Sequence, residues 1–450
     1  MQTTEKVAKL VCRFNYDQIP ARGVEQAKAA LIDAVGVSLL GAEESAEKAL
    51  MKYAVSGVPE ARIWATGEKT TLRNAVLVNS ACVHAIDYDN GGSLGHPSCL
   101  LAPAVLGLAE TRRLTGKQII EAYTVGVELG GRLRESLGNI QMGAGWHATS
   151  LLGPMAVAAA CSKLLELDEW KTRMAIALAA PLGGGMLQSF GTNAKAFQVA
   201  RASESGVLAA LLAAEGCEGD PYILEERKGF YYVYGQEQGC SIKQLTANFG
   251  EPVILAKERG HFKQWPCCGG NYEVLSALTD LLAERAVPID EIVHITVAMS
   301  MQPPGPVLRV HPRNADEGRF SIAYNVASCL VDGDVGLNTF TEKQFNRPVI
   351  HELMDKVELA WAEECAGKPA RLQGESRFID LTIRFRDGSV ITRRQNAANR
   401  KQLEASQVYD KYAGIARRFG RDEEKINAAI ALMQNFEQCD DAKEFLNLAV

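Results

Sequence analysis

Two aspartates and two histidines lie close together between positions 84 and 98. Asp87, Asp89 and His96 belong to a glycine-rich turn that precedes an apolar stretch, and His84 stands just before it. A carboxylate beside an imidazole raises its pKa and orients its ring, which makes the two groups a general acid/base pair. The alternative is a turn whose aspartates bond to their own backbone. We interpret His84 as a structural residue.

The same segment contains a G-x-S-x-G pattern at positions 91–95, with Ser93 in its centre. In serine hydrolases this motif needs a buried strand immediately before it and a helix after it. The residues before it are Asp-Tyr-Asp-Asn, and this half of the chain shows no series of strands. The surroundings of the motif therefore argue against a serine nucleophile.

Two further residues with acid/base or anion-binding chemistry stand in apolar surroundings. His147 follows Trp146 just before an alanine-rich run, so it is expected at a helix start, as a catalytic acid/base or as a capping residue. Lys195 follows the stretch PLGGGMLQSFG. A lysine buried there would bind an anion or have a lowered pKa, whereas a lysine that reaches solvent would do neither.

The last candidates lie in the second half of the chain. Cys267 and Cys268 are adjacent, and one of them could be a thiolate base, although a buried cysteine more often acts as a small apolar residue. Arg319 and Tyr324 are five residues apart, so they need not share a helix face. Tyr324 could donate a proton or contact an anion.

Composition excludes several classes of function. The 450 residues carry 48 Lys and Arg against 54 Asp and Glu, a net charge of -6 that predicts no broad contact with nucleic acid or anionic membranes. The sequence has no P-loop, no G-x-G-x-x-G after a strand and no zinc-ligand spacing, so neither a nucleotide nor a metal is indicated. Eleven scattered cysteines, no apolar stretch of about 18 residues and no secretory leader lead us to expect reduced thiols and a cytoplasmic protein.

Helical elements must position these residues in the first part of the chain. Residues 1 to about 260 are rich in Ala, Leu, Gly and Val. Apolar residues at helical spacing predict helices at Gln26–Leu40, Ser98–Leu114 (with Ser98 as N-cap), Gly116–Leu129, Ser150–Leu165 and Ser203–Glu215. Several of these are apolar nearly all round, which is typical of helices buried in a large core.

The pattern changes near Lys263. Residues 291–299 alternate and are β-branched, and residues 377–385 and 389–394 flank an Asp-Gly turn, which predicts a hairpin. Helical stretches lie between them, from near Arg319 and at 341–357, and the helical pattern returns after about 398, most clearly at 423–436. We predict a mainly α protein, with a discontinuous helical domain (1–262 plus 396–450) and a smaller α+β lid (263–395).

These segments together resemble the MmgE/PrpD family of 2-methylcitrate dehydratases, cis-aconitate decarboxylases and an iminodisuccinate epimerase. The resemblance covers essentially the whole chain and is most specific in the GHPS and GWHATS blocks, in Lys195, in KQWPCC and in FSIAYNVASC. It implies a large helical domain with a lid, a homodimer, no cofactor and a small polycarboxylate as substrate. It places Asp87, His96, His147, Lys195 and Tyr324 in a pocket between domain and lid.

The resemblance also implies roles. Lys195, Lys263 and Arg319 would hold substrate carboxylates, Asp87 would orient His96, and a histidine would move a proton next to a carboxylate. Family lyases commonly have a histidine shortly after the lid proline, where this chain has Cys267 and Cys268. Cys268 would contact substrate there. We therefore expect a cofactor-independent lyase (dehydratase or decarboxylase), with an isomerase of a small dicarboxylate or a non-catalytic carboxylate-binding homologue as alternatives.

Overall fold

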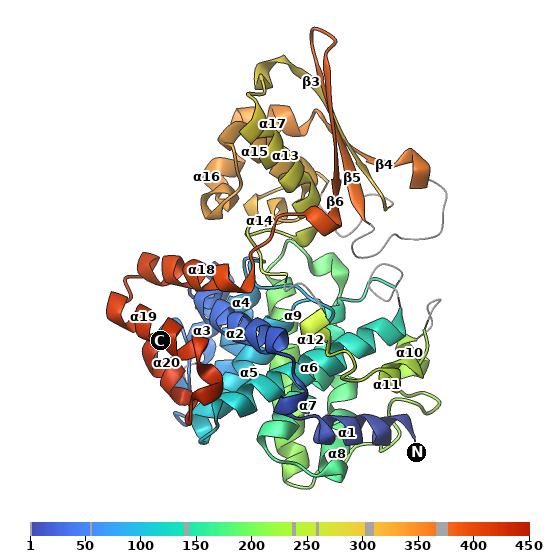
Figure 1. The fold of residues 1–450 in the computed structure, drawn as a ribbon, viewed down its shortest axis with the longest axis vertical. Helices are drawn as coiled ribbons and strands as arrows, with labels where there is room; N and C mark the ends of the chain where they lie inside the picture. The colour runs from blue at the N-terminus through green and yellow to red at the C-terminus, as the bar shows by residue number, and fades with distance from the viewer. Residues whose placement is uncertain are drawn as a thin grey trace.

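A large helical domain makes up the lower part of the molecule in Figure 1. The computed structural model describes residues 2–54, 56–138, 144–235, 240–257, 261–301, 310–365 and 377–450. The helices of the first part of the chain are α1 (Thr3–Arg13), α2 (Ala21–Gly41), α3 (Ser45–Ala54), α4 (Leu72–His84), α5 (Pro97–Thr111), α6 (Gly116–Leu137), α7 (Ala148–Leu164), α8 (Glu169–Ala179), α9 (Ala194–Ala214), α10 (Phe230–Tyr234), α11 (Gln244–Ala247) and α12 (Ile254–Lys257), with a small β1 (Ala61–Arg62) and β2 (Lys69–Thr70) pair after α3. No helix within these ranges is long and apolar enough to cross a membrane.

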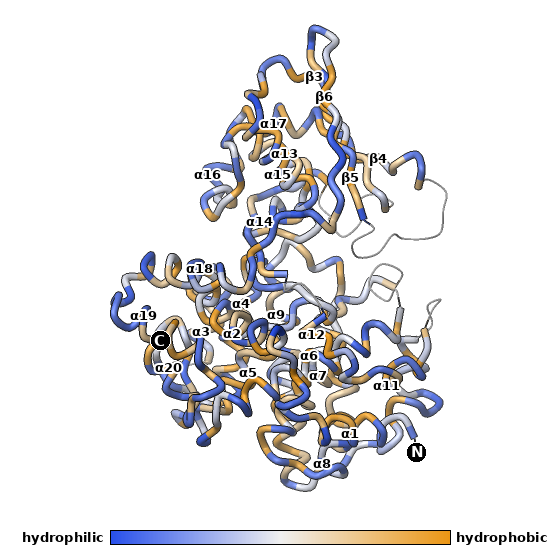
Figure 2. Tube along the Cα trace, viewed as in Figure 1, coloured by the Kyte–Doolittle hydropathy of each residue, from blue (hydrophilic) through white to orange (hydrophobic). Residues whose placement is uncertain are grey.

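The centre of this domain is formed by helices that are buried on every side. In α5 all residues from Pro97 to Glu110 are buried, and Figure 2 shows its hydrophobic character. Helices α7 and α9 approach each other closely, because a Cβ placed on Gly206 of α9 would lie 2.6 Å from the Pro154 carbonyl oxygen of α7. This close packing brings the N-terminal ends of α7 and α9 toward the same region.

The C-terminal helices α18 (Ala405–Arg418), α19 (Glu423–Gln434) and α20 (Lys443–Ala449) return to the helical domain. Figure 1 shows them, in red, beside the blue α2 and α3. Tyr412 of α18 lies against Gly36 of α2, at 3.1 Å from the position of a Cβ on that glycine. Val408, Phe436 and Leu446 belong to the same hydrophobic core as the N-terminal helices.

The lid has a four-stranded sheet with the order β4-β3-β5-β6. Its elements are α13 (Tyr272–Glu284), β3 (Ile292–Met299), α14 (Ala315–Gly318), α15 (Ile322–Asp332), α16 (Glu342–Phe345), α17 (Pro348–Met354), β4 (Val357–Trp361), β5 (Phe378–Phe385) and β6 (Val390–Asn396). Strands β3 and β4 are parallel, and the other neighbouring pairs are antiparallel. The helices α13, α15 and α17 cover one face of the sheet (Figure 1), and Ile295, Val297, Leu381 and Ile383 contribute to the lid's own hydrophobic core.

The chain crosses between the two regions twice, and the crossings lie side by side. The Leu403 N–H donates to the Phe262 carbonyl at 3.0 Å. Lys263 therefore stands directly at the junction between the helical domain and the lid.

The mainly α fold with a smaller α+β region is as predicted, but several boundaries differ. Helix α9 begins at Ala194 rather than Ser203, which places Lys195 in its first turn. Helix α5 begins at Pro97 with His96 as N-cap residue, so Ser98 is inside the helix, where its hydroxyl pairs with that of Tyr123 at 2.8 Å. The predicted helix at 341–357 is wrong, because two short helices and then β4 occupy the stretch from 342 to 361.

Candidate active site

Asp87 is at the centre of the site, in the loop that links α4 to α5. Its φ of 55° places it in the left-handed region, which aspartate tolerates better than most residues. Its carboxylate accepts hydrogen bonds from Lys195 Nζ at 2.6 Å (Oδ1) and from Lys263 Nζ at 2.5 Å (Oδ2). Lys263 Nζ also donates to the Asp87 main-chain carbonyl at 2.6 Å. One buried carboxylate thus joins the first turn of α9 to the junction with the lid.

The two ammonium groups determine the charge of this carboxylate. Burial alone would raise the pKa of Asp87, but Lys195 and then Lys263 outweigh it and hold this pKa well below its usual value. For Lys263 burial acts to lower the pKa, and Asp87 and then Asp89 more than reverse this effect. Asp87 is therefore ionised and Lys263 protonated near neutral pH.

His84, the last residue of α4, lies under this ion pair and is fully buried. Its Nδ1 is 3.1 Å from Asp89 Oδ2, and its Nε2 is 2.6 Å from Lys195 Nζ. An ammonium group can only donate, so Nε2 is the acceptor and Nδ1 carries the proton that Asp89 accepts. Burial, and then the charge of Lys195, lower the pKa of His84 to about 4, so this imidazole is neutral at pH 7.

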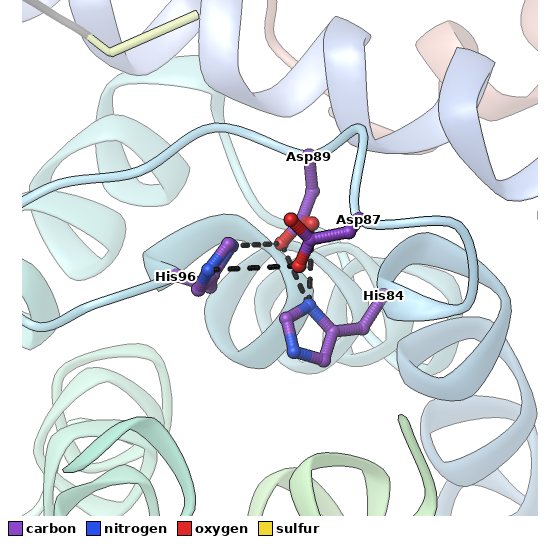
Figure 3. A group of neighbouring side chains, drawn as sticks. All are labelled: His84, Asp87, Asp89 and His96. Carbon is purple, nitrogen blue, oxygen red and sulfur yellow. Dashed lines mark hydrogen bonds and ion pairs between the residues drawn. The ribbon is translucent and has the colours of Figure 1, made fainter. Parts of the chain in front are cut away.

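Asp89 also orients His96, and Figure 3 shows the two aspartates between the two histidines. His96 Nδ1 lies 3.1 Å from Asp89 Oδ2, whereas its Nε2 is 4.0 Å from Asp87 Oδ1. We expected Asp87 to orient His96, but the orienting carboxylate is Asp89. Asp87 instead accepts hydrogen bonds from the two lysines. Because Nδ1 is the nitrogen that donates to Asp89, the neutral form of His96 has an unprotonated Nε2.

His147, the N-cap residue of α7, has the opposite arrangement. Its Nδ1 lies 2.7 Å from the amide Nε2 of Gln198. The orientation of this amide follows from its other bonds, since Gln198 Oε1 accepts from the Met186 N–H at 3.1 Å and Nε2 donates to the Met186 carbonyl at 3.3 Å. Nδ1 of His147 is thus an acceptor, and the neutral ring carries its proton on Nε2. Burial, and then the charge of Lys195, keep the pKa of His147 well below its usual value.

The two imidazoles line one cleft of about 710 Å³ between the helical domain and the lid. His147 packs edge-on against Phe190 with ring centres 4.9 Å apart. His96 is the more exposed of the two, with 19% of its side chain accessible. Among the described residues, the Lys, Arg, Asp and Glu side chains that line the cleft are Arg22, Arg132, Arg134, Lys257, Arg377, Arg400 and one carboxylate, Glu135.

The structure does not bring Tyr324 and Arg319 into this cleft. Tyr324 is fully buried in the lid core against Phe340 and Phe345, and its hydroxyl donates to the Thr339 carbonyl at 2.5 Å. The Arg319 guanidinium donates to the Pro266 carbonyl at 3.0 Å and is buried. Tyr324 thus holds lid segments together, whereas Arg319 also donates to the Ile86 carbonyl of the helical domain at 3.4 Å. Neither residue is among the described residues that line the cleft.

The paired cysteines differ in position. Cys267 is completely buried, while Cys268 lines the cleft and packs with Phe190 and Phe320. Burial, followed by the charge of Asp87, raises the pKa of the Cys268 thiol. Cys268 is therefore a thiol at neutral pH and not the thiolate base that the sequence left open.

The residues His84, Asp87, Asp89 and His96 also offer four potential metal ligands within 4.8 Å of one another, the one such group found in the described residues. Lys195 Nζ lies 2.6 Å from both His84 Nε2 and Asp87 Oδ1, and Lys263 occupies Asp87 Oδ2. A divalent ion would have to share these ligand atoms with two ammonium groups. The donor set therefore suits the lysines better than a metal ion.

Two residues of the site, His84 and Gln198, had no functional role in the sequence interpretation. His84 was treated as structural, although its spacing of three from Asp87 at a helix end was a usable signal. Gln198 carries no titratable group, and its only signal is its place one turn after Lys195 on α9. Asp89 was recognised as a candidate without its role. Ser93 lines the cleft, but no strand within the described residues leads into its motif, so the structure agrees with the case against a serine nucleophile.

The fold and the cleft together define a mainly α protein with a smaller α+β part and a cleft at their junction that is lined by His96 and His147. Residues 5–243 match the family model of the MmgE/PrpD N-terminal domain and residues 265–435 that of the MmgE/PrpD C-terminal domain, so the chain belongs to the MmgE/PrpD family. It is 26% identical to human cis-aconitate decarboxylase over 99% of this chain and 94% of that protein. It is 25% identical to the mouse cis-aconitate decarboxylase (99% and 93%) and 26% identical to the cis-aconitate decarboxylase-like protein oryM of Aspergillus oryzae (86% and 84%).

Proposed function

We propose that this protein is a lyase that acts on a small di- or tricarboxylic acid without a cofactor. The observation that carries the proposal is the opposite proton arrangement of two imidazoles in one cleft. The neutral form of His96 has an unprotonated Nε2, because Asp89 accepts from its Nδ1. His147 offers an Nε2–H, because Gln198 donates to its Nδ1. A proton acceptor and a proton donor thus line the same cleft.

This pair supports elimination next to a carboxylate. His96 Nε2 takes the proton from the carbon beside a carboxylate, the electron pair forms a carbon–carbon double bond, and the bond to a hydroxyl on the next carbon breaks. His147 protonates the leaving hydroxide, which departs as water. Positive charge around the cleft stabilises the carboxylate as negative charge develops on it. General acid/base help is worth about 10² to 10⁴ in rate for each group.

The same proton donor, His147, supports decarboxylation of an unsaturated tricarboxylic acid. The carbon–carbon bond to the departing carboxylate breaks with loss of CO₂, its electron pair shifts the double bond, and the far carbon takes a proton from His147. The relatives that match over nearly the whole chain are named as cis-aconitate decarboxylases. We therefore propose decarboxylation as the first reaction to test and dehydration as the second.

An isomerase is a second candidate, and the observation that favours it is Cys268. This thiol lines the cleft and stays protonated, so it could return a proton to a carbon from which His96 has removed one. Such an enzyme would exchange a proton beside a carboxylate and release neither water nor CO₂.

The test is to incubate the protein in heavy water with cis-aconitate, 2-methylcitrate, citrate, iminodisuccinate and malate, and to follow each acid by NMR. We expect one or two acids to react, with CO₂ release and a single deuterium in the product for decarboxylation, or a new alkene for dehydration. A deuterated stereoisomer of the starting acid would identify the isomerase instead. If the folded protein binds an acid without any turnover or exchange, the chain is a carboxylate-binding homologue and the proposal fails.

Matched variants test the site assignment. His147→Asn and His96→Asn should each lower the rate by at least about 10²-fold. The control is His294→Asn, because His294 lies on β3 of the lid with 40% of its side chain exposed. Full activity in either cleft variant would overturn the assignment of that histidine.

A further inference from the structure

Three arginines and a histidine converge on one side of the cleft, next to the acid/base pair. Arg400 donates a hydrogen bond from its guanidinium to His261 Nδ1. Arg134 donates to the Ser93 carbonyl at 3.2 Å, and its Nη1 lies 3.7 Å from the position of a Cβ on Gly95, the residue before His96. Arg377 lines the same cleft.

The guanidinium groups of Arg377 and Arg400 are largely buried and share one carboxylate. Arg377 Nε is 3.0 Å and Arg400 Nη1 is 3.7 Å from the same Glu273 oxygen, so two guanidinium groups share one carboxylate. Only 19% of the Arg377 side chain and 12% of the Arg400 side chain are exposed. Partly buried cations that share one counter-ion favour the binding of a further anion.

His261 reports the same excess of positive charge. Burial, and then Arg400, Arg377 and Arg134, lower the pKa of His261 to about 3. The neutral His261 ring accepts a hydrogen bond from Arg400, so one N–H group of Arg400 is used in this contact. The His261 carbonyl in turn accepts from the Gly91 N–H at 2.9 Å, which ties Arg400 to the loop that carries Asp89 and His96.

His96 and Arg400 line a common cavity whose size suits a small acid. A second, smaller cavity of about 90 Å³ is lined by His96, Lys263, His261, Arg400 and Gln402, so His96 and Arg400 face the same confined space. A ligand that has one end at His96 needs only a few carbon atoms to reach Arg400.

We propose that Arg400 and Arg134, with His261 as the orienting group, form a subsite that binds the carboxylate of the substrate farthest from the reacting carbon. The subsite selects tricarboxylic acids over shorter dicarboxylic acids. It rests on the proposed function for the position of the reacting carbon, but its affinity for a polycarboxylate can be measured without any turnover.

The experiment is isothermal titration of the full-length protein with propane-1,2,3-tricarboxylate and with butanedioate, neither of which needs to react. We expect the tricarboxylate to bind more tightly. Arg400→Gln should weaken tricarboxylate binding by about 10-fold or more and leave butanedioate binding within about 3-fold, because only the longer acid reaches the subsite. Arg134→Gln, on a different element, should show the same selective loss.

Arg384→Gln is the control, because Arg384 is an exposed residue of β5 on the lid. Arg400→Lys keeps the charge and loses the planar fork, so it should recover part of the affinity. Equal weakening for both acids, or unchanged tricarboxylate binding in a folded Arg134→Gln protein, would overturn the subsite. If the wild-type protein binds both acids equally, the proposed selectivity of the subsite is wrong, even if turnover of another acid supports the lyase. If the variants confirm the subsite but no acid is turned over, the proposed function fails and the subsite stands.

Discussion

Exchange of a single amide for a carboxylate at Gln198 should reverse the proton arrangement of His147. In Gln198→Glu, one oxygen still accepts from the Met186 N–H, as Gln198 Oε1 does now at 3.1 Å. The other oxygen replaces the amide nitrogen that lies 2.7 Å from His147 Nδ1, and it can only accept. The neutral ring must then carry its proton on Nδ1, which leaves Nε2 unable to donate to a substrate.

The size of the effect follows from the hydrogen bond that is exchanged. In the wild-type protein, an Nδ1–H tautomer would face the Gln198 amide protons, and such an unsatisfied buried donor costs about 1–3 kcal/mol. The Nε2–H form is therefore favoured by about 5- to 150-fold. In Gln198→Glu the preference reverses, and loss of the general acid lowers kcat at pH 8 by about 10² to 10⁴. Gln198→Leu removes the preference without reversing it and should cost about 10-fold or less.

The assay is a pH profile of kcat for the acid found to react. Only the doubly protonated ring of Gln198→Glu has an Nε2–H, so the activity of this variant should recover as the pH falls, whereas the wild-type protein keeps its donor at neutral and alkaline pH. Nitrogen-15 shifts of labelled histidine report the tautomer directly. The control is Gln244→Glu, which adds the same charge at an exposed position on α11. Wild-type kcat at pH 8 in a folded Gln198→Glu protein would refute the reasoning.

Three further perturbations test the buried part of the site and the lid. Asp87→Asn leaves two buried ammonium groups without a carboxylate and should lower the free energy of unfolding in urea at pH 7 by about 3–5 kcal/mol. The control Asp380→Asn, at a half-exposed ion pair, should lower it by less than about 1 kcal/mol. Equal losses in the two variants would contradict this prediction. Tyr324→Phe should keep kcat within about 3-fold and lose about 1 kcal/mol, because the hydroxyl bonds a lid carbonyl; a 100-fold lower kcat would restore its catalytic role. The pKa of His84 is about 4 when folded and about 6.5 when unfolded, so its contribution to stability is complete above pH 6.5 and is lost as the pH falls toward 4. By pH 5 the loss should amount to about 2 kcal/mol, and His84→Asn should remove that part of the pH dependence in urea titrations.

The helical core was predictable because its signal is local. Apolar residues at helical spacing and runs of small residues describe α5 and α7 without knowledge of their neighbours. The strand β4 was not predictable from local sequence, since Val357–Trp361 becomes a strand through parallel pairing with β3, more than fifty residues away in the chain. The start of α9 was missed because its first turns carry polar residues beside apolar ones, and only packing against α7 decides them.

Sequence spacing predicted some residues of the candidate site but not the contacts between them. Spacing placed Asp87 and His96 in one turn, but which aspartate orients His96 depends on Lys195 and Lys263, which arrive from distant segments. Tyr324 was assigned to the cleft by family resemblance, and the packing of the lid turns its hydroxyl to Thr339 instead. Neither fact is encoded by nearby residues.

The position of Lys195 also changes the role that this residue has in the chemistry. Its ammonium group is held by Asp87 and His84, and Lys195 is not among the described residues that line the cleft, so we propose an electrostatic role for it rather than contact with a substrate carboxylate. Its charge instead lowers the pKa of His84 and of His147, after burial, and so keeps both rings neutral. In the proposed mechanism, a neutral His147 with a fixed tautomer donates its proton where a negative charge develops, and the arginines that line the cleft bind the carboxylates. Removal of the Lys195 charge should therefore change the pH profile of kcat more than it changes the affinity for the substrate.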